Sequence, residues 1–116
     1  MLSAINRIKK KKDFEAIFKN SKSLRTNFFI LKIKENGLGI NRFGFVVSQK
    51  VSKRAVVRNK IRRRLSDIIR SQTENIKTGT DLVIIAFPGI DKKEFSEVKN
   101  FVESALNKTG LMIKKQ

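Results

Sequence analysis

A chain of 116 residues with 40% apolar content is long enough for one domain with a modest core. Its 27 Lys and Arg outweigh 10 Asp and Glu, and the net charge of +17 favours a polyanionic partner, either a nucleic acid or an anionic membrane surface. The chain has no Cys, which excludes disulfides and thiolate metal sites, and no His, which argues further against a zinc site.

The N-terminal segment does not have the pattern of a secretory signal. Residues 1–5 are too few for the apolar region of such a signal, and the positive charges follow them instead of preceding them. No apolar run approaches the ~20 residues that a membrane-spanning helix needs. We therefore expect a soluble, cytoplasmic protein.

The first predicted element is a short helix over residues 11–20. Phe14, Ile17 and Phe18 recur at i, i+3 and i+4, and Asp13 suits the first turn because its charge favours the positive end of a helix.

Three extended segments follow. Residues 23–26 give a weak signal, and residues 28–34 (FFILKIK) give a stronger one. Residues 42–48 (RFGFVVS) predict the next strand, running antiparallel to its predecessor because the connection is short.

Residues 54–70 change to a helical period. The stripe predicted to lie on the sheet consists of Val57, Ile61, Leu65 and Ile68. The positive charges therefore project from a different face of the helix.

Residues 81–87 (DLVIIAF) form an unbroken apolar run, which is typical of a strand covered on both sides. Asp91 is the predicted N-cap of a last helix that stops near Gly110. The predicted buried stripe of that helix is Phe95, Val98, Val102, Ala105 and Leu106.

The density of positive charge is greatest in the central helix. Residues 50–70 hold nine Lys or Arg and a single acid, Asp67, whereas a merely solvated helix normally mixes charges of both signs. Arg is favoured in its centre, and a guanidinium can bind phosphate through two hydrogen bonds. Membrane binding fits less well because the apolar stripe is needed to cover the sheet, and the pattern lacks the paired helices of common DNA readers. RNA is the favoured partner.

The segment RFGFVVSQKVSKRAVVRNKIRRRLSDIIR resembles the signature region of the bacterial ribonuclease P protein component. Arg58, Asn59 and Lys60 match the RNR-type motif of that family, and Arg62 and Arg63 follow Ile61. The start INRIKKKKDFEAIF and the strand DLVIIAF resemble the corresponding segments of that family in order and spacing, so the resemblance extends over essentially the whole chain.

This resemblance implies an α+β fold in a single domain over residues 1–116. The order would be α-β-β-β-α-β-α, with a small, mainly antiparallel sheet and a left-handed βαβ crossover. It also implies the protein subunit of a ribozyme that removes the 5′ leader from precursor tRNA. The expected partners are the ribonuclease P catalytic RNA and the single-stranded leader, with no membrane or DNA partner.

The resemblance assigns two surfaces and leaves one alternative open. The residues expected to bind the catalytic RNA are Lys53, Arg54, Arg58, Asn59, Lys60, Arg62 and Arg63. Those expected at the leader are Phe14, Phe18, Leu31, Ser48 and Lys50, with auxiliary phosphate contacts from Arg7, Lys9 and Lys10. Leu31 stands where relatives often carry a Tyr. Alternatively, Phe14 and Phe18 simply belong to the core.

No catalytic group is expected in the polypeptide itself. The ten acids form no recognisable metal-binding pair, and without His there is no side chain suited to general-base catalysis near neutral pH. Mg²⁺ would be held mainly by the RNA subunit, and no organic cofactor or protein-bound metal is expected. Two other classes remain open: a structural RNA-binding protein such as a ribosomal component, and an independent protein nuclease.

Overall fold

The computed structural model describes residues 6–110. Its helices are α1 (Lys11–Lys19), α2 (Ala55–Gln72) and α3 (Phe95–Thr109), and its strands are β1 (Lys22–Arg25), β2 (Phe29–Glu35), β3 (Arg42–Val46) and β4 (Thr80–Ala86). Two short 3-10 turns, η2 (Thr73–Asn75) and η3 (Ile90–Lys92), flank β4. The predicted order α-β-β-β-α-β-α is confirmed.

The four strands form one sheet in the order β1-β2-β4-β3. The pairs β1–β2 and β2–β4 are antiparallel and β3–β4 is parallel, so the sheet is mainly antiparallel, as predicted. β2 and β3 run in opposite directions, but they are not neighbours as a short hairpin would make them, because β4 lies between them. β4 is apolar on both faces, so the centre of the sheet is the position that buries it best. The left hand of the β3–α2–β4 crossover stays a prediction.

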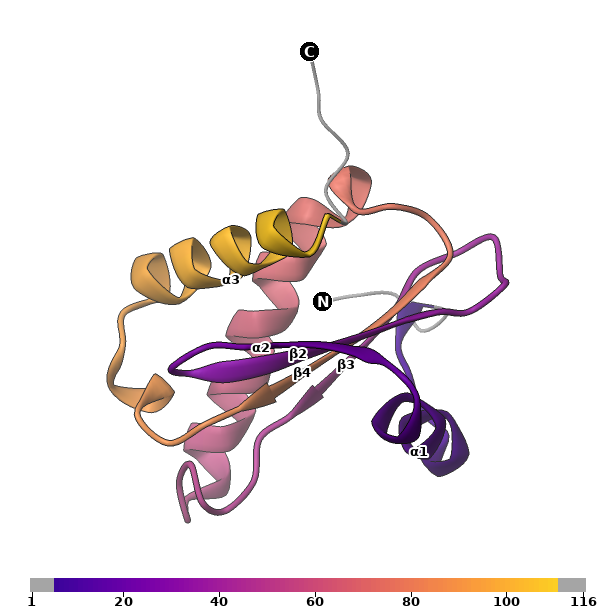
Figure 1. Cartoon of the computed structure of the whole chain (residues 1–116). Helices are drawn as coiled ribbons and strands as arrows, with labels where there is room; N and C mark the ends of the chain where they lie inside the picture. Colours follow the sequence, from indigo (N-terminus) through magenta and orange to yellow (C-terminus); the bar gives the residue numbers. More distant parts are fainter. Residues whose placement is uncertain (1–5, 111–116) are drawn as a thin grey trace.

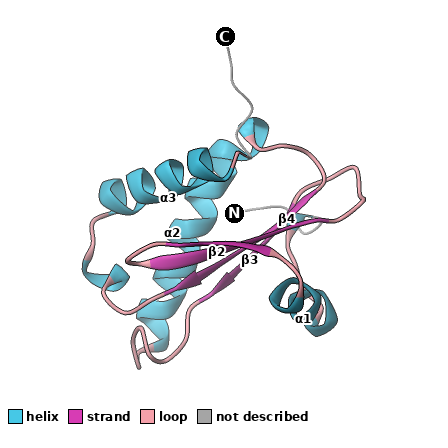
Figure 2. Ribbon diagram, viewed as in Figure 1, coloured by secondary structure: helices cyan, strands magenta, loops and turns pink. Residues whose placement is uncertain are grey.

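The two faces of the sheet are covered unequally. Helices α2 and α3 lie on one side, and α1 alone lies on the other (Figure 1). Figure 2 shows the same division, with the strands between the helices.

The main core lies between the sheet and the two long helices. Helix α2 contributes Ile61, Leu65, Ile68 and Ile69, and α3 contributes Val98, Val102, Ala105 and Leu106. The predicted stripe of α2 is therefore confirmed at three positions, while Val57 is only partly buried. Ile69 completes the buried face because a helix that crosses a sheet needs a stripe wider than one residue per turn.

A smaller cluster holds α1 to the other face. Ile8, Ile17 and Val83 are buried in it, with Phe14, Val46 and Ile85 packed around them. The residues before α1 run beside β3. Arg7 forms an isolated parallel β-bridge with Phe43, and the Ile8 N–H donates to the Phe43 carbonyl at 2.9 Å.

The start of α3 differs from the prediction. Asp91 is not its N-cap: it lies in η3, where its Oδ1 accepts a hydrogen bond from the Gly89 N–H at 3.2 Å. The N-cap is Glu94, whose N–H donates to the Glu97 carboxylate at 3.3 Å. Phe95 is the first residue of the helix, and it is 41% exposed instead of buried. The predicted end is confirmed, since Gly110 is the C-cap with φ of 75°.

The packing of α2 is testable by comparing two positions on that helix. Leu65→Ala removes a fully buried side chain, and we expect a loss of about 2–5 kcal/mol in the free energy of unfolding. Val56→Ala is the matched control because Val56 is 72% exposed, and its effect should stay within about 0.5 kcal/mol. Urea denaturation of both variants measures the difference, and equal effects would contradict the packing described for α2.

Candidate nucleic-acid interface

The predicted cationic face of α2 and the connector before it is present in the fold. The residues of this set that are exposed to solvent are Lys53, Arg54, Asn59, Lys60 and Arg63. Asn59, Lys60 and Arg63 lie away from the stripe that packs on the sheet, because a helix separates residues that are not three or four positions apart. Lys53 and Arg54 belong to the connector before the helix. We call Lys53, Arg54, Arg58, Asn59, Lys60, Arg62 and Arg63 the α2 surface.

Arg58 and Arg62 differ from the rest of the α2 surface because they bind the protein's own backbone. The Arg58 Nη1 donates to the carbonyls of Ser52 at 3.0 Å and Lys53 at 2.9 Å. The Arg62 Nη2 donates to the Val47 carbonyl at 3.1 Å, and its Nη1 donates to the Asn59 Oδ1 at 2.6 Å. These contacts fasten the connector between β3 and α2 to the helix.

A guanidinium carries five N–H donors, so these contacts leave others on Arg58 and Arg62 for a ligand. Both side chains are half-buried, whereas Lys60 and Arg63 project freely into solvent. The sequence pattern predicted one RNA-binding set that includes Arg58, Lys60, Arg62 and Arg63, and it did not distinguish the residues that also bind the backbone from those that are only exposed. Arg64 is also half-buried and donates to the Lys93 carbonyl at 3.4 Å, consistent with a stem along the edge of the core.

Phe14 and Phe18, the two aromatic side chains of α1, have different surroundings. The Phe14 ring lies against the backbone of Gly44: a Cβ at that position would come within 2.7 Å of the ring. Phe18 is 45% exposed, and the two ring centroids are 6.2 Å apart. Phe14 is therefore partly a packing residue, while Phe18 offers an open aromatic face.

Leu31 is not on this side of the sheet. It is fully buried beneath α2 and α3, and its exposed fraction is 0%. Side chains alternate along a strand, so the neighbouring Lys32, which pairs with Val83, faces α1 instead. Leu31 is therefore not available to a ligand on the α1 side, because a shift of one residue along a strand moves the side chain to the opposite face. Alternation within FILKIK signals this, because Lys32 and Lys34 share one face.

The part of the sheet beside α1 remains partly open. Ile30, Lys32, Val46 and Ile85 are all half-buried on this face, in contrast to the full burial of Leu31, Leu82 and Ile84 on the other. An apolar floor flanked by exposed cations and a ring is chemically suited to unpaired bases and phosphates.

The remaining predicted residues are exposed but dispersed. Ser48 and Lys50 follow the end of β3, and the Ser48 Oγ accepts the Lys50 N–H at 3.3 Å. Arg7, Lys9 and Lys10 precede α1 and are exposed. Ser48 is four positions beyond Gly44, about 13 Å at the rise of a strand, so these side chains would follow an extended ligand instead of forming one pocket.

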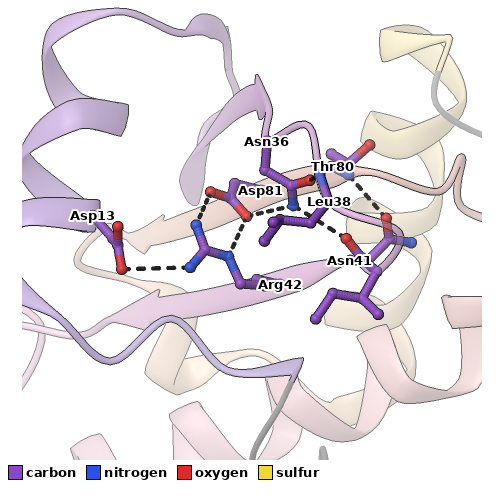
Figure 3. A network of polar contacts seen from close by, with 8 residues as sticks. Asp13, Asn36, Leu38, Asn41, Arg42, Thr80 and Asp81 are labelled. Carbon is purple, nitrogen blue, oxygen red and sulfur yellow. Dashed lines mark hydrogen bonds and ion pairs between the residues drawn. The ribbon is translucent and has the colours of Figure 1, made fainter.

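Arg42 is a cation beside α1 that is already engaged. Its Nε and Nη2 donate to the Asp81 carboxylate at 2.9 and 2.6 Å, and its Nη1 donates to the Asp13 Oδ2 at 3.4 Å (Figure 3). The hydrogen bonding that Arg42 donates to the Asp81 carboxylate raises the pKa of Arg42 above its ordinary value. Because this pKa is raised, the stability that charged Arg42 gives to the fold is fully present below the ordinary pKa of arginine. It is lost only as the pH rises through the raised pKa, so Arg42 stays charged around neutral pH.

The acids within residues 6–110 do not assemble a metal site, since no three of them gather as possible ligands. Asp81 and Asp13 are both occupied by Arg42. Over the same residues, no helix has the length and apolarity to cross a membrane.

Comparisons with known proteins agree on one family. A family model for ribonuclease P matches residues 2–110. The ribonuclease P protein component of Alkaliphilus oremlandii is 34% identical over 96% of both chains, and that of Thermoanaerobacter sp. (strain X514) is 38% identical over 96% of this chain and 95% of its own.

Solved structures give the same result. The Staphylococcus aureus RNase P protein superposes with a TM-score of 0.86 at 28% identity, covering 92% of this chain and 97% of that one. The Thermotoga maritima RNase P protein gives 0.78 at 29% identity, covering 87% and 96%.

The contact between Phe14 and Gly44 gives a stability prediction. Gly44→Ala places a methyl group where the Phe14 ring lies, so we expect a loss of about 1–3 kcal/mol in the free energy of unfolding. Gly39→Ala is the control, because nothing lies within 4 Å of its Cβ position. Equal stability of the two variants in thermal or urea unfolding would show that the packing of Phe14 does not require a glycine at position 44.

The division within the α2 surface gives a second prediction. Arg62→Ala removes the hydrogen bond to the Val47 carbonyl, and we expect it to lower the free energy of unfolding by about 1 kcal/mol. Arg63→Ala removes an exposed side chain of the same type and should change it by less than about 0.5 kcal/mol. Urea denaturation without RNA distinguishes the two positions. A larger loss of stability in Arg63→Ala than in Arg62→Ala would refute the structural role assigned to Arg62.

Proposed function

Because this chain belongs to the ribonuclease P protein family, we propose that it binds the ribonuclease P catalytic RNA and the 5′ leader of precursor tRNA. The chain is a protein component of that enzyme, and its curated relatives carry the same description over nearly their full length. The reaction is the endonucleolytic removal of the leader, in the cytoplasm.

The observation that carries this proposal is the α2 surface. Three exposed residues of α2, two exposed residues of the connector before it, and two arginines with spare donors lie outside the stripe of the helix that is buried in the core. So many positive charges at close range repel one another, and an array of phosphates relieves that repulsion. The catalytic RNA supplies such an array, and each neutralised phosphate also releases counterions.

The leader is assigned to the partly open face beside α1. Phe18 provides a stacking surface, which is worth about 1–3 kcal/mol per base in single-strand binding. Phe14, Ser48 and Lys50 remain in the proposed site, with Arg7, Lys9 and Lys10 as auxiliary phosphate contacts. Lys32 takes the place of Leu31, which is buried.

The hydrolytic chemistry is assigned to the RNA subunit. The acids of the described residues do not fit a Mg²⁺ site, because no three of them gather and because Asp13 and Asp81 are held by Arg42. Phosphate oxygens of a folded RNA are suitable ligands for Mg²⁺. The contribution of this chain is to hold the substrate and to reduce electrostatic repulsion as phosphates approach the RNA.

Reconstitution with the catalytic RNA from the same source tests the proposal. Adding the protein should raise cleavage of precursor tRNA at low Mg²⁺, and it should tighten binding of a substrate with a leader more than one without. The variant with Arg58, Arg62 and Arg63 all changed to Ala should bind the catalytic RNA more weakly, with a shallower salt dependence.

Different outcomes select different functions. Stable association with ribosomal particles and no effect on leader-bearing substrates would favour a structural RNA-binding protein. Cleavage by the polypeptide alone, without RNA, would mean that it is a nuclease in its own right.

A further inference from the structure

Asp81 is a fixed anchor at the centre of the sheet. Its side chain is only 5% exposed, and besides Arg42 it accepts a hydrogen bond from the Asn36 Nδ2 at 2.9 Å. Asn36 is itself held, because its Nδ2 donates to the Ile40 carbonyl at 3.1 Å and its Oδ1 accepts the Leu38 N–H at 2.7 Å. Arg42 therefore extends from a rigid support (Figure 3).

The other end of this arrangement is the first turn of α1. Arg42 reaches across to Asp13, so a single guanidinium connects β3, β4 and the helix. Asp13 and Arg42 are both partly shielded, with side-chain exposures of 24% and 22%. Partial shielding strengthens such a contact relative to an exposed ion pair, because less water screens it.

Helix α1 depends on tertiary contacts for its placement. It has nine residues, fewer than the ~12–15 at which isolated helices become even marginally stable in water. Its N-cap, Lys10, makes no side-chain capping bond, and Lys11 and Lys12 place positive charge at the positive end of the helix. Asp13 is the one acid of that first turn.

The helix is attached to the sheet at two places. One is the charged contact of Asp13, and the other is the apolar contact that Phe14 and Ile17 make with Gly44 and Val83. Phe18 comes after both and is more exposed than either. If the charged contact is removed, the helix keeps only its apolar contact, about which it can tilt, and any tilt displaces the Phe18 ring.

We propose that Asp13 is a positioning residue: through Arg42 it sets the angle of α1 and thereby holds the Phe18 ring over the face where the leader binds. This inference rests on the proposed leader-binding function. The Asp13 carboxylate is bound to Arg42 and would repel phosphate. Its contribution to leader binding therefore passes through Phe18.

A double-mutant cycle in the holoenzyme tests this dependence. The variants are Asp13→Asn, Phe18→Ala and the double variant, and the measured quantity is the ratio of affinities for precursor tRNA with and without its leader. Asp13→Asn should reduce this ratio by about threefold to tenfold, and it should cause no further loss when Phe18 is already Ala. Asp13→Glu keeps the carboxylate and should recover part of the loss.

Glu15→Gln is the matched control for charge. It lies on the same helix and changes the net charge by the same amount, but Glu15 is exposed and pairs only loosely with Lys11 at 3.9 Å. Affinity for the catalytic RNA, assigned to the α2 surface, should stay within about twofold in every variant, which separates repositioning from loss of folded protein.

The outcomes are distinguishable. An Asp13→Asn effect no larger than that of Glu15→Gln, or one that adds fully to Phe18→Ala, would overturn the positioning role while leaving the leader surface intact. If Phe18→Ala alone leaves the ratio unchanged, the proposed leader surface fails and the positioning role fails with it.

Discussion

Burial of the apolar stripe of α2 is the constraint on which the functional surface depends. Ile61, Leu65, Ile68 and Ile69 must face the sheet to complete a core that a chain of this size cannot otherwise build. Once they are buried, the basic residues around them lie outside the stripe: Lys60 and Arg63 are exposed, while Arg62 and Arg64 are half-buried and bind backbone carbonyls at its edge. Packing energy thus holds together charges that would separate if the helix were free, and it presents them in a fixed spacing to a folded polyanion.

The unequal covering of the sheet separates two kinds of recognition. The side beneath α2 and α3 is closed and serves stability, and the helix that closes it carries the cations on its outer side. The side beneath α1 is only partly closed, since a nine-residue helix cannot cover four strands. The surfaces proposed for the catalytic RNA and for the leader therefore belong to differently covered sides of the sheet.

Local pattern predicted most of this fold, and its failures have specific physical reasons. The periods of the helices and strands located every main element, and the family resemblance supplied the order. The pattern could not reveal that β4 lies between β2 and β3, because pairing over long sequence separations leaves no local signal. Asp91 resembled an N-cap because its side chain does cap a turn, but the turn is η3 and the helix begins later. Leu31 was expected at the leader surface but is buried on the other face of the sheet. The backbone contacts of Arg58 and Arg62 depend on carbonyls that only the folded connector brings within reach.

The central position of β4 also has a consequence for how the chain is made. β2 and β3 have no edge in common and are joined only through a strand that comes late in the sequence. During translation, the first two thirds of the polypeptide can form the β1–β2 ribbon and the short pairing of Arg7 with Phe43, but they lack the strand that joins these parts into one sheet. The basic segment that becomes α2 therefore emerges before the sheet on which it packs is complete, in a cell rich in competing polyanions. The sheet can form only after residues 80–86 leave the ribosome and pair with β2 and β3, which lie far away in the sequence.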